Sequence, residues 1–492
     1  MKSTSIKYSV AALLVFLLAG SSCKKILDLQ PHNSTFTEAY FKTGTDANTA
    51  ISGAYALLRS VLMAHQSWHV YGDLPSGEYA SGGNQDAFTS PICNGQFVGL
   101  NVGNWEWNWQ NYYQLIQQIN LVINKVPQIP VGSFTDPALK TQIVGEAYFL
   151  RAFTYFYMSR IWGDVPLKLQ PDLDVSQAAN IPRTPAATVL AQCLADCDSA
   201  ASRLVFGYSD PTMVAVRANK GSVYALKAHI QAWQHDYAAC EKSADVVISQ
   251  GKYQLVDSTS YAQVFIGRSP EGIFEININY AQSEGVALNN DDGSGDAGWL
   301  PTLADPYITG LTTPVWSYSD IYKQHIFPDS VYDFRKNLFF LGNNQTIKYS
   351  NIFFADGSKK SDPRLSNNLN IFRLADIMLL RAEALNKLGR DNEAITLLDA
   401  VRARSGLYAY DPSVPNTPDL EFVILEERQR ELFYEGQAYY DLCRHGADVL
   451  NQYNSNFSID QAKAGGMLWP IDPGMFRDDF TLTQTPYWRG KL

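Results

Sequence analysis

Aromatic and polar residues that could bind a ligand gather in two irregular regions of the sequence. Trp and Tyr rings can pack on the apolar face of a sugar, while Asn, Asp, Gln and Arg side chains bond its hydroxyl groups. Such rings must be displayed by loops on a rigid scaffold. For each Trp, packing inside the protein is an equally strong alternative. The candidate residues are Trp68, Tyr71, Asn101 and Trp105 in the first region, and Trp299, Trp316 and Tyr318 in the second.

The sequence contains no motif for catalysis. It lacks a nucleophile elbow, an HExxH zinc motif, a Walker loop and a Cys/His metal set. Residues 293–298 have the glycine spacing of a dinucleotide fingerprint, but no strand pattern precedes them and no helix pattern follows. We therefore expect no catalytic residue. Carboxylate pairs are abundant among 49 acidic residues, so a glycosidase stays open as an alternative.

Two further clusters match cation ligands only in part. Asp292, Ser294 and Asp296 alternate as calcium ligands do, but Leu303 stands where an EF-hand loop has its bidentate carboxylate. His65 and His69 can share a helix face, yet the sequence offers no third ligand. We expect no metal site and no cofactor, and leave a loop calcium ion as an alternative.

The amino terminus has the pattern of a bacterial lipoprotein. Lys2 and Lys7 precede an apolar run over 10–19 that is too short to span a bilayer. Small residues then lead to Cys23, as in a lipobox. This pattern predicts a signal peptide over 1–22 and lipid attachment at Cys23, whose several acyl chains would anchor the protein stably. Ordinary signal cleavage beside an incidental Cys is the alternative.

The composition fits a folded protein that does not bind nucleic acid. The chain has 492 residues, 46% of them hydrophobic, and a formal net charge of −10 without a basic run. An acidic surface repels nucleic acid. Cysteines after Cys23 are too few and odd in number for a disulfide framework, so we expect buried free thiols. They are Cys93, Cys193, Cys197, Cys240 and Cys443.

Helical patterns dominate the chain and must position the candidate residues. Apolar residues at helical spacing predict helices over 47–59, 109–126, 142–162, 186–204, 220–234, 236–249, 372–388, 392–405 and 420–440. Ala228 and Cys240, and likewise Ala382 and Ala394, are small residues twelve apart on consecutive helices. This spacing is typical of tetratricopeptide-type hairpins, with two generic hairpins as the alternative. Residues 251–366 combine loop residues with short β-type runs.

Several stretches, in order, resemble the SusD/RagB family of surface lipoproteins. The chain opens with Cys23-Lys-Lys-Ile-Leu-Asp-Leu-Gln-Pro31, and its most specific match is 146–156 followed by Arg160-Ile-Trp-Gly-Asp-Val-Pro-Leu167. Further matches are 381–386, 401–407, 426–432, 435–436 and the closing 468–473. Gln484-Thr-Pro-Tyr487 departs from the family's usual Gln-Asn-Pro-Gly-Tyr. We interpret the charged residues of 426–432 as an ion network on a helix surface.

The resemblance implies a mainly α fold in which tetratricopeptide-like helix hairpins support a large irregular region of loops and short strands. It implies a signal peptide over 1–22, an N-terminal SusD-like region over 23–250, and a C-terminal region over 251–492 that is loop-rich to 366. It also implies an oligosaccharide or polysaccharide ligand, a SusC-like TonB-dependent transporter as partner, and a lipid-anchored position on the outer-membrane surface. A surface-anchored hydrolase and a RagB-type peptide-binding or adhesion lipoprotein are the alternatives.

Overall fold

The computed structural model describes residues 40–80, 88–99, 102–103, 105–174, 177–279, 301–342, 344–354 and 363–492. Long helices begin where a side chain caps them. Thr43 and Asp46 form a capping box at the start of α4 (Gly44–Met63), which begins three residues earlier than the sequence suggests. Asp136 caps α8 (Pro137–Trp162), and Asn219 caps α10 (Lys220–Trp233). These caps fix the entry of the helices that carry the scaffold.

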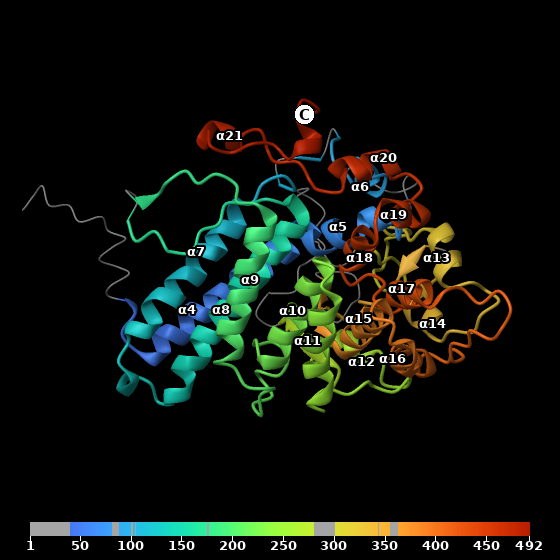
Figure 1. Ribbon diagram of the computed structural model, residues 1–492, viewed down its shortest axis with the longest axis horizontal. Helices are drawn as coiled ribbons and strands as arrows, with labels where there is room; N and C mark the ends of the chain where they lie inside the picture. Colours follow the sequence, from blue (N-terminus) through green and yellow to red (C-terminus); the bar gives the residue numbers. More distant parts are fainter. Residues whose placement is uncertain are drawn as a thin grey trace, which may run out of the picture.

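Four long helices pack together on one side of the molecule. They are α4, α7 (Gln110–Lys125), α8 and α9 (Ala186–Ala201), and Figure 1 shows them side by side at the left of the view. Arg151 of α8 forms a two-pronged ion pair with Asp196 of α9, at 2.7 and 2.8 Å. The arginine therefore binds a carboxylate inside the scaffold.

The two predicted hairpins form and lie next to each other. The first joins α10 to α11 (Tyr237–Ser249), and the second joins α15 (Leu374–Lys387) to α16 (Asp391–Arg404). Ala228, Cys240, Ala382 and Ala394 are all fully buried, so the small residues do allow the close approach. Helix α11 packs on α15, which makes the hairpins neighbours although 124 residues separate them in the chain.

The helix predicted over 420–440 is interrupted. It forms α17 (Leu420–Glu431) and α18 (Ala438–His445), followed by α19 (Ala447–Tyr453). Between the first two, Tyr434 and Gly436 have positive φ angles of 55° and 72°. A Cβ atom at Gly436 would lie 2.2 Å from the indole nitrogen of Trp68. Contact with a residue far away in the chain therefore breaks the helix, which local spacing could not reveal.

The described part of the loop-rich middle of the chain holds three small antiparallel sheets. Strand β1 (Gly272–Ile276) pairs with β6 (Leu369–Arg373), β2 (Phe340–Leu341) with β3 (Gln345–Thr346), and β4 (Ile352–Phe354) with β5 (Pro363–Leu365). The remaining short α-helices are α5 (Ser67–Gly72), α6 (Thr89–Cys93), α12 (Gln263–Ile266), α13 (Asp320–Ile326), α14 (Arg335–Phe339), α20 (Ile459–Gln461) and α21 (Met475–Asp478). Helix accounts for 53% of the residues that the structure describes, so the mainly α class is confirmed.

One hydrophobic core extends from Ala47 to Trp488, and a smaller one lies around α15, α16 and α17. Cys93, Cys193, Cys197 and Cys240 are buried free thiols, whereas Cys443 is only partly buried. Among the helices of the described residues, none combines the length and apolar character needed to cross a bilayer.

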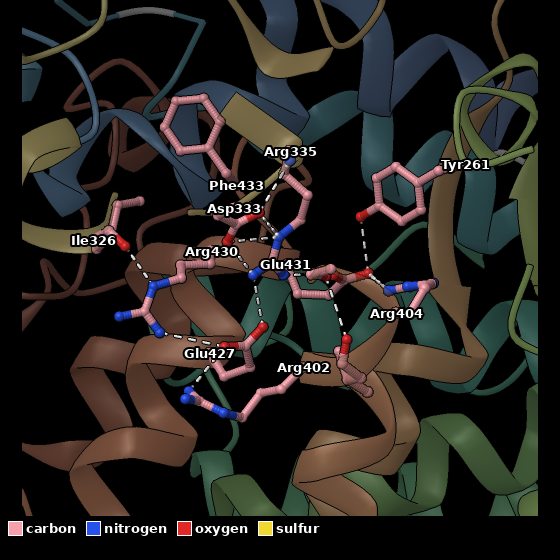
Figure 2. A network of polar contacts seen from close by, with 12 residues as sticks. Tyr261, Ile326, Asp333, Arg335, Arg402, Arg404, Glu427, Arg430, Glu431 and Phe433 are labelled. Carbon is pink, nitrogen blue, oxygen red and sulfur yellow. Dashed lines mark hydrogen bonds and ion pairs between the residues drawn. The ribbon is translucent and has the colours of Figure 1, made fainter. Parts of the chain in front are cut away.

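The charged residues of α17 form a buried ion network, not the surface network expected. Glu427 and Glu431 have no exposed surface, and Arg335 contacts them at 2.8 and 2.7 Å (Figure 2). Burial acts to raise the pKa of Glu431, but the guanidinium groups of Arg404, Arg373 and Arg335 hold that pKa well below its ordinary value. The order of charged residues in the sequence does not show whether they lie in the interior of the protein or on the surface of a helix.

Candidate functional site

Trp105 is the one candidate ring that the described residues expose. The residue is 36% exposed, and the centroid of its ring lies 4.2 Å from that of His65. His65 and Gln66 adopt positive φ angles of 49° and 59° in the short turn between α4 and α5. Consecutive non-glycine residues in this region cost conformational energy, so surrounding packing must hold them there. The turn therefore supports the Trp105 ring.

Backbone contacts fix the turn that carries Trp105. The buried Glu106 side chain accepts a bond from the Gly103 N–H at 3.2 Å, and Tyr71 donates its hydroxyl to the Glu106 carbonyl at 2.9 Å. Trp107 donates its indole N–H to the Phe97 carbonyl, and its own carbonyl accepts from the Asp472 N–H. Burial raises the pKa of Glu106 to about 7. A ring fixed in this way needs little ordering before it stacks on a ligand.

Trp68 and Tyr71, predicted as ligand contacts, are packing residues in this structure. Trp68 has no exposed surface, stacks on Tyr157 at 5.5 Å and donates its indole N–H to the Glu435 carbonyl. Tyr71 is 1% exposed and lies edge-on to Trp469. Neither ring has a face left for a ligand. Tyr71 instead helps to position Trp105 through its bond to Glu106.

Trp316 and Tyr318 are likewise buried, which removes the contact surface predicted for them. Trp316 packs edge-on against Tyr79, and Tyr318 donates its hydroxyl to the Gly342 carbonyl at 2.9 Å. A β-bridge joins Tyr79 to Tyr318, so the two irregular regions do meet in space. Sequence reasoning could not decide which of these rings face outward.

Several predicted residues lie outside the described residues. They are Asn101, Trp299, the lipid-attachment residue Cys23, and the loop positions Asp292, Ser294 and Asp296. Within the described ranges, no cluster of three His, Cys, Asp or Glu side chains has the spacing to hold a metal ion. His69 is buried and bonds Asp73 at 2.5 Å, while His65 contacts Trp105.

A groove of about 800 Å³ adjoins the Trp105 turn, and sequence reasoning missed it. One wall is α7, whose Gln110, Tyr113, Gln114 and Gln117 follow the i, i+3, i+4, i+7 spacing of a single helix face. The facing walls come from residues 166–181 and from the tail over 472–482, which includes α21. In Figure 1, α21 lies on the same side of the molecule as α7. The repeat of glutamines at helical spacing on α7 is the sequence pattern that could have predicted this groove.

Two family models match the chain. Residues 340–488 match the SusD family, and residues 93–231 match a family described as starch-binding associating with the outer membrane. The chain belongs to the SusD/RagB family. Members of this family are carbohydrate-binding proteins without catalytic activity, and this membership confirms the prediction that the chain is not an enzyme.

Similar proteins cover almost the whole chain. SusD-like protein P38 of Formosa agariphila is 28% identical, with 96% of each chain covered. A solved SusD homolog from Bacteroides thetaiotaomicron is 27% identical with a TM-score of 0.78, covering 91% of this chain and 99% of its own. A structure described as a laminarin-binding SusD-like protein is 21% identical with a TM-score of 0.70, covering 90% and 99%. This SusD-like chain therefore shares its fold with these solved structures over most of its length.

Proposed function

We propose that this SusD-like protein binds an oligosaccharide or polysaccharide on the cell surface and delivers it to a SusC-like TonB-dependent transporter in the outer membrane. Cys23 carries the lipid that anchors it, and Trp105 is a ligand-stacking ring. The observation that carries the proposal is the exposed Trp105, held rigid by His65 and Glu106, in a member of a carbohydrate-binding family.

The chemistry of the Trp105 turn suits a sugar. An exposed indole offers a flat apolar face, and hydrogen bonds of Glu106 and Trp107 already hold the described backbone beside it, so binding loses little conformational entropy. The lipobox places the folded body outside the inner membrane, where polymers too large for simple diffusion are met. A soluble binding body without catalytic residues then needs a separate transporter to move the ligand inward.

Affinity electrophoresis tests the ligand and the ring together. The wild-type protein, Trp105→Ala and Tyr408→Ala would be run through gels that contain single polysaccharides, laminarin among them. Tyr408 is the matched control because it is 92% exposed and lies in the loop after α16. We expect at least one polysaccharide to retard wild type and Tyr408→Ala, and Trp105→Ala to bind about tenfold more weakly. Equal retention of all three proteins would contradict the role of Trp105.

The transporter partner requires a separate experiment. A tagged full-length chain would be purified from native membranes in mild detergent, and the proteins that elute with it identified by mass spectrometry. We expect a TonB-dependent barrel in roughly equal amount. Its absence, together with proteolysis showing no surface exposure of the tagged chain on intact cells, would overturn the delivery step while leaving glycan binding standing.

A further inference from the structure

The groove beside α7 has the features of a second binding surface. Its walls are held by Arg183, which donates to the Asp164 carbonyl at 2.8 Å, the Thr483 carbonyl at 2.9 Å and the Trp162 carbonyl at 2.8 Å. These bonds tie the end of α8, the 164–184 segment and the C-terminal tail together. Gln117 adds a pair of bonds to the backbone of Asp172 at 2.7 and 2.9 Å. The groove therefore has a fixed shape.

Several polar side chains that line the groove are available to bind a ligand. Among the described residues, the side chains of Gln110, Gln114, Arg477 and Asp478 have no hydrogen-bond or ion-pair partner, and all four line the groove. Two amides, a guanidinium and a carboxylate offer both donors and acceptors. The partly exposed Tyr113 provides a ring between them, with its hydroxyl donated to the Pro166 carbonyl. Donors, acceptors and a ring together match the surface of a sugar.

Charge restricts which sugars fit. Among the described residues that line the groove, four are carboxylates (Asp172, Asp472, Asp478 and Asp479) and two are cations (Lys168 and Arg477), and Lys168 is paired with Asp172. A uronic acid or a sulfated sugar would meet excess negative charge at short range. Neutral hydroxyl groups can instead donate to these carboxylates. The groove thus favours a neutral glycan.

The groove lies beside the Trp105 turn. Asn108, which lines the groove, donates its backbone N–H to the Trp105 carbonyl at 3.2 Å, and Asp472 of the facing wall donates its own to the Trp107 carbonyl at 3.0 Å. One extended chain can therefore contact both places. Resting on the glycan binding proposed above, we infer that the α7 groove is a second subsite for the same neutral chain, which makes the protein selective for long, uncharged oligosaccharides.

Titration calorimetry with a ladder of neutral oligosaccharides tests this inference. The ladder is prepared from the polysaccharide that retards wild type most. The test proteins are Gln114→Ala/Arg477→Ala, which removes two of the four unpartnered groups, and Ala179→Arg, which fills the groove from an exposed position. The control is Gln250→Ala, an exposed glutamine at the end of α11. Thermal unfolding of each variant checks that it is folded.

We expect wild-type affinity to rise with oligosaccharide length. Both groove variants should bind the longest oligosaccharide about tenfold more weakly and the shortest as wild type does, while Gln250→Ala follows wild type throughout. Groove variants that match wild type at every length, with only Trp105→Ala impaired, would overturn the second subsite and leave the proposed function intact. Tighter binding of an acidic ladder would also overturn it. Failure of wild type to bind any glycan would overturn the proposed function and this inference with it.

Discussion

Glu106 is a buried carboxylate next to the exposed Trp105, and its environment makes stability depend on pH. Burial raises its pKa from 4.5 to about 7, so the folded protein retains a proton that the unfolded chain releases between these values. The contribution of Glu106 to the free energy of unfolding is therefore fully present below pH 4.5. It is lost as the pH rises through about 7. By linkage, the loss is at most about 3 kcal/mol.

We predict that Glu106→Gln stabilises the protein at pH 8 relative to wild type and much less at pH 5. The amide stays neutral at every pH, and its oxygen can still accept from the Gly103 N–H. Urea unfolding at both pH values measures the difference. Glu275, whose pKa is also raised to about 7 by burial, is present in both proteins and its effect cancels. If the unfolding free energies of variant and wild type differed by the same amount at both pH values, Glu106 would not be the source of the pH dependence.

Residue type did not reveal which rings face outward. Trp68 and Trp105 occupy the same irregular region, yet one has no exposed surface and the other is 36% exposed. The indole of Trp68 is held by the Glu435 carbonyl, 367 positions away in the chain. Only the fold brings that partner near. The stacking chemistry was readable from the sequence, whereas the exposure that selects Trp105 was not.

At the scale of elements, local spacing located the long helices well. The predicted helix over 220–234 forms as Lys220–Trp233, and small residues such as Ala382 and Ala394 correctly marked a hairpin. The errors arose where distant contacts decide the structure. Gly436 packs against Trp68 and ends the helical run after α17, and distant arginines turn the charges of α17 into a buried network.

The buried ion network of α17 predicts which contact holds α14 and α17 together. Arg335, at the start of α14, pairs with Asp333 and with Glu427 and Glu431 of α17, and it has no exposed surface. Arg335→Met would leave buried carboxylates without this partner, so we expect a loss of about 3–5 kcal/mol in unfolding free energy. Arg390→Met is the control, because its pair with Glu393 is exposed and screened by solvent, so its loss should cost much less stability. Chemical unfolding of both variants gives the comparison. If both variants lost a similar amount of unfolding free energy, burial would not explain the contribution of the network to stability.

At the scale of the whole molecule, the fold explains why segments far apart in sequence act as one scaffold. Residues 250–373 leave the helical array after α11, and the array resumes at α15, which packs on α11. The loops and short strands between them are therefore displayed from a continuous helical support (Figure 1). The same support carries the C-terminal tail, whose 472–482 segment forms a wall of the α7 groove.

A binding body of this kind captures polymer for the cell only if it is tethered, and Cys23 is the proposed tether. Its thiol would carry a diacylglycerol and its new amino terminus an acyl chain, and several chains hold far more firmly than one. We predict that cells fed an alkyne-bearing fatty acid label the wild-type protein and Cys443→Ala, but not Cys23→Ala. Cys443 is the control because it is the partly buried thiol of the folded body. The unlabelled variant should also disappear from the outer-membrane fraction. Label that persists in Cys23→Ala would mean that the lipobox pattern is incidental, and capture at the cell surface would then need another anchor.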